Sequence, residues 1–140
     1  MKTEYSKKVM DHWLHPRNPG DLADANGYGR LKGTCGDAME IFIHVSSDYK
    51  ITNASFMTDG CTTTIATGSV AVDLAIGRSI QSAKRISQKV ILETLEGLPE
   101  ESEHCALLAA DTLKAAIDNY LIMRDLPGKG IYHSARGNRR

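Results

Sequence analysis

Hydrophobic and polar residues alternate along residues 39–45, which is the pattern of a strand with one buried face. The polar stretch 46–50 then predicts a turn, and residues 51–58 supply the second arm of a hairpin. Residues 28–34 form a third, weaker strand pattern ahead of this hairpin. The three segments together predict a small antiparallel sheet.

A short amphipathic helix is predicted at the start of the chain. Tyr5, Val9 and Trp13 recur every four residues and therefore share one face of residues 4–14. Pro16 closes the segment, because proline is poorly tolerated inside a helix. We expect this helix to pack across the rest of the domain.

The remainder of the chain is predicted to be helical. One helix follows Cys61 and stops at Gly77, two short helices occupy residues 79–95 with a break near Ser87, and a long helix covers residues 102–124. The expected buried face of the first of these carries Ile65, Ser69, Val72 and Ile76. The expected buried face of the long helix carries Leu107, Ala110, Leu113, Ile117 and Leu121. With the sheet, this predicts an α/β (α+β) fold of three strands and about five helices.

Length and charge add limits to this picture. The 140 residues, 41% of them hydrophobic, suffice for one domain, which we expect over residues 1–126, with a mobile basic tail over 127–140. Lys plus Arg and Asp plus Glu both number 17, so the balance does not suggest nucleic-acid binding. Charged residues interrupt the N-terminal apolar positions and no stretch is long enough to span a membrane, so a cytoplasmic protein is expected.

The three cysteines, Cys35, Cys61 and Cys105, are an odd number at wide spacing, which favours reduced thiols over a disulfide framework. A single free cysteine is usually a small buried hydrophobic residue. Here each cysteine has polar or turn-forming neighbours and lies at the end of a predicted element, which favours metal or thiol chemistry. Cys61 and Cys105 are expected to be reactive, because the positive end of a helix stabilises a thiolate.

The stretch "GTCGDAM" places Asp37 two residues after Cys35, and His104 directly precedes Cys105. Residues i and i+2 of an extended chain project to the same side, so Cys35 and Asp37 can converge. With Cys61 the set holds three thiolates, one carboxylate and one imidazole, one more than a tetrahedral zinc or a 2Fe–2S cluster needs. Asp37 is the weaker ligand for such a cluster, so the site is expected to exchange its contents.

The other histidines are expected to be structural or exposed. His12 and His15 have a spacing that could bind metal, but no third ligand is nearby and a surface position is the better interpretation. His44 and His133 are interpreted in the same way. A Cys–His hydrolase is disfavoured, because the adjacent His104 is badly placed to act as a general base on its neighbour.

Four motifs together resemble one family of proteins. They are "YSKKVMDHWLHPRNPG", "GTCGDAM", "FMTDGCTTTIATGS" and "LPEESEHCALLAADTLKAAI". The chain is similar, over nearly its full length, to the IscU family of iron–sulfur cluster assembly scaffolds, also found as the N-terminal module of NifU. This resemblance implies a three-stranded antiparallel sheet with packed helices and ligand loops clustered at one exposed end.

The resemblance also implies a function without enzymatic turnover. A cysteine desulfurase that uses pyridoxal phosphate donates persulfide sulfur, iron joins it, and a labile 2Fe–2S cluster is built and passed to apo-proteins. Frataxin-like and ferredoxin partners would supply iron and electrons, and the cluster-bound form would be a monomer or a homodimer.

Carried over by position, the resemblance makes Cys35, Asp37, Cys61, His104 and Cys105 the cluster and metal ligands. It makes Cys105 the main persulfide acceptor and Asp37 the residue that keeps the cluster labile. Whether Asp37 or His104 completes the site stays open. Tyr5 matches a tyrosine implicated in pairing scaffolds, although a packing role fits its place on the apolar stripe equally well.

Two comparisons within the family affect the expected partners. Bacterial members carry the chaperone-binding sequence L-P-P-V-K where this chain has "LPEES", so recognition by the dedicated Hsp70-type chaperone is not expected. The SufU branch has an insertion between its second and third cysteines and lacks the histidine, whereas this chain has His104 and no insertion. This favours the scaffold over the alternative, a zinc-bound sulfur acceptor that activates a desulfurase, although an apo-scaffold could still bind zinc.

Overall fold

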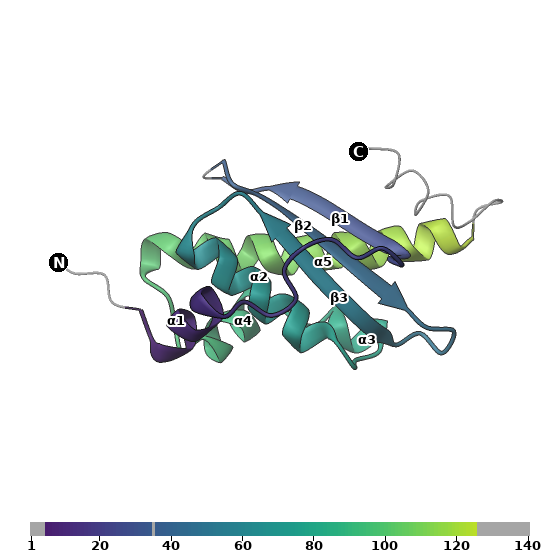
Figure 1. Ribbon diagram of the computed structural model, residues 1–140, viewed down its shortest axis with the longest axis horizontal. Coiled ribbons are helices and arrows are strands. Elements are labelled where there is room, and N and C mark those ends of the chain that lie inside the picture. Colours follow the sequence, from purple (N-terminus) through teal and green to yellow (C-terminus); the bar gives the residue numbers. More distant parts are fainter. Residues whose placement is uncertain (1–4, 35, 126–140) are drawn as a thin grey trace.

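Three antiparallel strands form one sheet in the order β1-β2-β3 in the computed structural model, which describes residues 5–34 and 36–125 (Figure 1). The strands are β1 (Gly27–Lys32), β2 (Ala38–Val45) and β3 (Ile51–Thr58). In the middle of the sheet, Ile41 of β2 lies opposite Gly29 and Phe56. The predicted sheet is thus confirmed, and β1 alone ends two residues earlier than expected.

Five α-helices accompany the sheet in the described part of the chain. They are α1 (Lys7–Leu14), α2 (Thr62–Ala75), α3 (Ile80–Ala83), α4 (Gln88–Thr94) and α5 (Glu103–Arg124), with a 3-10 turn at Glu100–Ser102. The break between the short helices falls at Ser87, whose side chain caps α4 by accepting from the Val90 N–H. All the predicted helices are therefore present, with boundaries shifted by a few residues.

The long helix α5 packs along β1 and β2, and α2 packs along β3, so both cover the same face of the sheet (Figure 1). On that face β2 buries Met39, Ile41 and Ile43 completely. Gly29 allows the close approach of α5, because a Cβ there would lie 2.6 Å from the carbonyl oxygen of Thr112. This packing brings the first turns of α2 and α5 side by side.

The opposite face of the sheet is crossed by the segment that joins α1 to β1 (Figure 1). Two hydrogen bonds from the Asn26 side chain hold this segment against β2. Its Nδ2 donates to the Val45 carbonyl oxygen, and its Oδ1 accepts from the Val45 N–H. Phe42 lies on this face and is fully buried, with its ring centroid 5.1 Å from that of Tyr28. The prediction of a strand with one exposed face is therefore wrong at Phe42, whose ring packs against Tyr28 of the neighbouring strand.

Two predicted helix faces also need correction. Helix α2 is buried almost all round, because its small side chains pack against α1, α5 and β3 together, whereas a single buried stripe was expected. In α5, Leu107 is 44% exposed and Leu108 is buried in its place. The rest of the predicted stripe is confirmed, because Ala110, Leu113 and Ile117 are fully buried and Leu121 packs against the core.

Residues 126–140 lie outside the described residues, and with them the predicted tail over 127–140 and His133. Among the residues that the structure describes, none of the helices has the length and apolar character needed to cross a bilayer.

Candidate functional site

The first turns of α2 and α5 meet at one end of the molecule. The hydroxyl of Thr63, in α2, lies 3.3 Å from Cys105 Sγ, in α5, and the hydroxyl of Thr64 lies 3.6 Å from the same sulfur. Cys61 is the N-cap residue of α2, two positions before Thr63. The two cysteines predicted at helix starts are therefore at the starts of two neighbouring helices.

A tight turn between β1 and β2 brings Asp37 to the same place. The Gly33 N–H donates to the Asp37 carbonyl oxygen at 2.7 Å, and the Gly36 N–H donates to the Gly33 carbonyl oxygen at 3.0 Å. Gly36 has a φ of 96°, a conformation that glycine adopts without strain. The Asp37 carboxylate is partly buried and accepts a hydrogen bond from the Thr64 hydroxyl at 2.9 Å.

The loop between β3 and α2 is fastened to the start of β2. Asp59 Oδ1 accepts from the Ala38 N–H at 2.9 Å, and the Thr58 hydroxyl donates to the Ala38 carbonyl oxygen at 2.6 Å. A Cβ on Gly60 would lie 2.6 Å from Thr64 Oγ1 and 2.7 Å from Asp37 Oδ2. Only glycine leaves room at this position for the Asp37–Thr64 contact.

The two described cysteines differ in exposure. Cys61 is exposed, and its thiol makes no capping hydrogen bond to α2, so it is free to bind another group. Cys105 is 3% exposed. The expectation of accessible thiols at an exposed end thus fits Cys61, whereas the Cys105 sulfur is covered by the first turn of α2.

His104 and Cys105 come together despite being consecutive. His104 Nε2 lies 3.8 Å from Cys105 Sγ. We expected adjacent residues to reach one point only from an irregular helix start, and the 3-10 turn at Glu100–Ser102 directly precedes α5. Both side chains therefore approach the same point of the site.

The predicted ligands fall into three groups in the structure. In the first group, His104 lies next to Cys105 directly and Asp37 is linked to Cys105 through Thr64. Cys61, at the adjacent start of α2, is the second group. The third, Cys35, lies outside the described residues. Within residues 5–34 and 36–125, no three Cys, His, Asp or Glu side chains are grouped closely enough to hold a metal ion. The combination of thiols, an imidazole and a carboxylate suits zinc or an iron–sulfur cluster chemically.

Thr63 and Thr64 were not identified as site residues from the sequence. Both are buried, and their hydroxyls contact Cys105 and Asp37. The available signal was the run of three threonines directly after Cys61, because β-branched residues are not the usual choice for the first turn of a helix. Spacing alone could not show which side chains these hydroxyls would meet.

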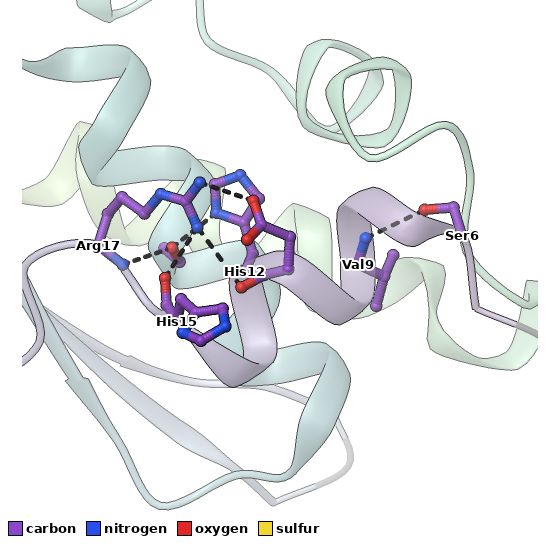
Figure 2. Close-up of polar contacts among 7 residues, drawn as sticks. Ser6, Val9, His12, His15 and Arg17 are labelled. Carbon is purple, nitrogen blue, oxygen red and sulfur yellow. Dashed lines mark hydrogen bonds and ion pairs between the residues drawn. The ribbon is translucent and has the colours of Figure 1, made fainter.

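A second polar cluster joins α1 to α2 (Figure 2). His12 Nδ1 lies 2.7 Å from Ser69 Oγ, which also accepts from the Arg17 N–H at 2.8 Å. The Arg17 guanidinium donates to Asp11 Oδ2 at 2.7 Å and holds the pKa of that carboxyl below its usual value. His12 is 7% exposed, so the predicted surface position was wrong. The side chain of His12 faces α2. Trp13, which was expected on the buried face of this helix, is 36% exposed.

Burial and the nearby Arg17 cation lower the pKa of His12 below its ordinary value of 6.5. The unfolded chain therefore binds a proton more readily than the native state as pH falls below 6.5. We expect the free energy of unfolding to decrease from that pH downward, by at most about 1.4 kcal/mol per pH unit from this one group. Urea unfolding of the parent and of His12→Gln between pH 7.5 and 5 measures this dependence, which the variant should reduce.

The matched control for this measurement is His15→Gln, at an exposed position of the same segment. It should keep the parent's pH dependence. An equal slope in the parent and in His12→Gln would contradict the assignment to His12.

The remaining residues singled out from the sequence have structural contacts. His44 is partly exposed, and its Nδ1 lies 2.9 Å from the Thr52 hydroxyl, which agrees with a structural role. Tyr5 packs against the hydrophobic core. Its packing role is therefore confirmed, and the pairing role is not tested by this contact.

Comparisons with known proteins agree with this architecture. Residues 4–125 match the family model described as "NifU-like N terminal domain". The chain is 44% identical over 117 residues to the iron–sulfur cluster assembly scaffold protein IscU 1 of Archaeoglobus fulgidus, covering 83% of this chain and 76% of the relative. It is 43% identical over 124 residues to the scaffold protein IscU of Aquifex aeolicus, covering 87% and 79%.

A solved structure shares the fold. The N-terminal part of a nitrogen-fixing NifU-like protein from Brucella abortus superposes with a TM-score of 0.66 at 18% identity, covering 84% of this chain and 94% of that one.

Proposed function

This chain belongs to the NifU-like N-terminal domain family, and we propose that it acts as a scaffold on which a labile 2Fe–2S cluster is assembled and then passed to apo-proteins. The observation that carries the proposal is that Cys105, at the start of α5, has His104 Nε2 3.8 Å from its sulfur and is connected to Asp37 through the Thr64 hydroxyl. The proposal requires no catalytic turnover. The protein binds its cargo, holds it and releases it.

The proposed cluster ligands are Cys35, Asp37, Cys61, His104 and Cys105. Asp37 and His104 both approach Cys105, Asp37 through the Thr64 hydroxyl and His104 directly, so either can complete the site beside the thiolates. A carboxylate oxygen is a hard donor and binds iron in a sulfide cluster more weakly than a thiolate. Ligation by Asp37 would therefore favour release, and ligation by His104 would favour retention.

Sulfur would arrive as a persulfide on a cysteine desulfurase, with Cys105 as the acceptor. The Cys105 thiolate would attack the terminal sulfur, forming a new S–S bond while the desulfurase cysteine leaves as a thiolate. Because Cys105 is 3% exposed, the turns that cover it must move before this attack. We propose that docking of the desulfurase at this end of the molecule supports that movement.

Other partners follow from the same role. Frataxin-like and ferredoxin proteins would supply iron and electrons, apo iron–sulfur proteins would receive the cluster, and the loaded scaffold would be a monomer or a homodimer. Glu100 and Glu101 are exposed directly before α5, which does not favour the Hsp70-type chaperone that recognises a neutral and cationic loop. We also propose that residues 1–126 form the scaffold domain and 127–140 a separate basic tail.

The experiment that tests the function is anaerobic reconstitution with a cysteine desulfurase, cysteine and ferrous iron. We expect visible charge-transfer bands and iron and sulfide in equal amounts, because a 2Fe–2S cluster contains two of each. The control is the same mixture without cysteine, which should give neither. One tightly held zinc, no sulfide and zinc-dependent persulfide transfer would instead support a zinc-bound sulfur acceptor and refute the scaffold.

A further inference from the structure

Thr64 is the side chain that joins the carboxylate of the site to its buried thiol. It is fully buried in the first turn of α2, donates to Asp37 Oδ2 at 2.9 Å and has its oxygen 3.6 Å from Cys105 Sγ. Residue 60 is a glycine, and a Cβ at this position would lie 2.6 Å from the Thr64 hydroxyl oxygen and 2.7 Å from Asp37 Oδ2. The loop that contains Gly60 therefore permits this contact because it has no Cβ at that position.

A threonine hydroxyl has one proton, and here it is directed to Asp37. Its oxygen can then only accept from a Cys105 thiol, and it cannot donate to a thiolate at the same time. One oxygen of the Asp37 carboxylate is occupied by Thr64, which leaves the other oxygen for a metal ion. A carboxylate held in this way keeps one orientation, as hydrogen-bonded partners of metal ligands commonly ensure.

We propose that Thr64 is a positioning residue that orients Asp37 toward the metal or cluster bound at this site. The inference rests on the proposed function, because it assigns a partner to one of its ligands. Thr63 has a different role, since its hydroxyl contacts Cys105 at 3.3 Å. Among the described residues, only Thr64 has a hydrogen-bond contact with both Asp37 and Cys105.

The test is a double-mutant cycle on the apo-protein, with Co²⁺ as the probe and its thiolate charge-transfer absorption as the readout. Thr64→Val keeps the shape of the side chain and removes the hydroxyl. In the parent background it should weaken Co²⁺ binding about 10-fold or more, in the range found for lost partners of metal ligands. In an Asp37→Ala background the same substitution should change the affinity by less than about 2-fold, because the residue it positions is gone.

Three further variants make the result specific. Thr64→Ser keeps the hydroxyl and should restore binding to near the parent value. Thr67→Val removes the buried hydroxyl one turn later, which donates to the Thr64 carbonyl oxygen at 3.0 Å, and should leave Co²⁺ affinity unchanged. Thr63→Val should change Co²⁺ affinity by the same factor with and without Asp37, because the Thr63 hydroxyl contacts Cys105. Circular dichroism of each variant establishes that it is folded.

The inference is overturned if Thr64→Val binds Co²⁺ as well as the parent or better, or if its effect is the same with and without Asp37. A parent that does not bind Co²⁺ at all would also overturn it. Cluster reconstitution in the parent tests the proposed function separately from the role of Thr64. Coupling between Thr64 and Asp37 without any cluster formation would refute only the scaffold, and cluster formation without coupling would refute only the role of Thr64.

Discussion

Cys105→Ser is expected to reduce the yield of reconstituted cluster at least about tenfold, because it removes a thiolate ligand and the proposed sulfur acceptor together. The sulfur lies against Thr63 and His104, and a serine hydroxyl can occupy the same space. The lower cluster yield should therefore come from the missing thiolate and not from unfolding of the protein. Sulfide content and visible absorbance after anaerobic reconstitution measure the yield, and thermal unfolding checks the fold.

The matched comparison for this experiment is Cys61→Ser, at the exposed N-cap of α2. It should also impair cluster formation, but it should leave persulfide on Cys105 detectable by mass spectrometry after incubation with desulfurase and cysteine. Full reconstitution in Cys105→Ser would remove this residue from the ligand set. Persulfide found mainly on Cys61 in the parent would transfer the acceptor role to the exposed thiol.

Asp37→Ala is expected to slow the loss of the assembled cluster several-fold. The carboxylate is the hardest donor of the proposed set, and without it the fourth position is left to the imidazole of His104, which already lies 3.8 Å from the Cys105 sulfur. Transfer to an apo-ferredoxin, followed by circular dichroism of the recipient, gives the rate. The prediction concerns release of the cluster, whereas binding of a single divalent ion to the apo-protein should weaken in the same variant.

Asp24→Ala removes a carboxylate at an exposed position of the segment between α1 and β1 and is the control for net charge. It should transfer its cluster at the parent rate. If Asp37→Ala transfers as fast as the parent, Asp37 does not control lability and His104 becomes the better candidate for the fourth ligand.

Much of the fold could be predicted because its signals are local. The alternation of residues 39–45 and the helical spacing after Cys61 depend only on near neighbours, and both elements are present. The predictions failed where a residue packs against a partner that is distant in sequence. Phe42 packs against Tyr28 of the neighbouring strand, and His12 contacts Ser69, 57 positions later in the chain.

The candidate site also has features that were predictable from sequence and features that were not. Cys61 and Cys105 were placed at helix starts from sequence, and both are there. Their different exposure was not predictable, because it depends on how the first turn of α2 lies against α5. The partly buried Asp37 was singled out for its spacing from a cysteine, but its contact in the described structure is with Thr64, on another element.

The sequence by itself determined the order of strands and helices, the family and the residue types available for binding a cluster, because these depend on local spacing and composition. Only the tertiary structure decided that Thr64 stands between Asp37 and Cys105, and that Cys105 is covered while Cys61 is open. The physical reason is that a hydrogen bond or a buried surface needs two segments at one point in space. Their approach is set here by the packing of α2 and α5 on one sheet and by a glycine small enough to permit the contact.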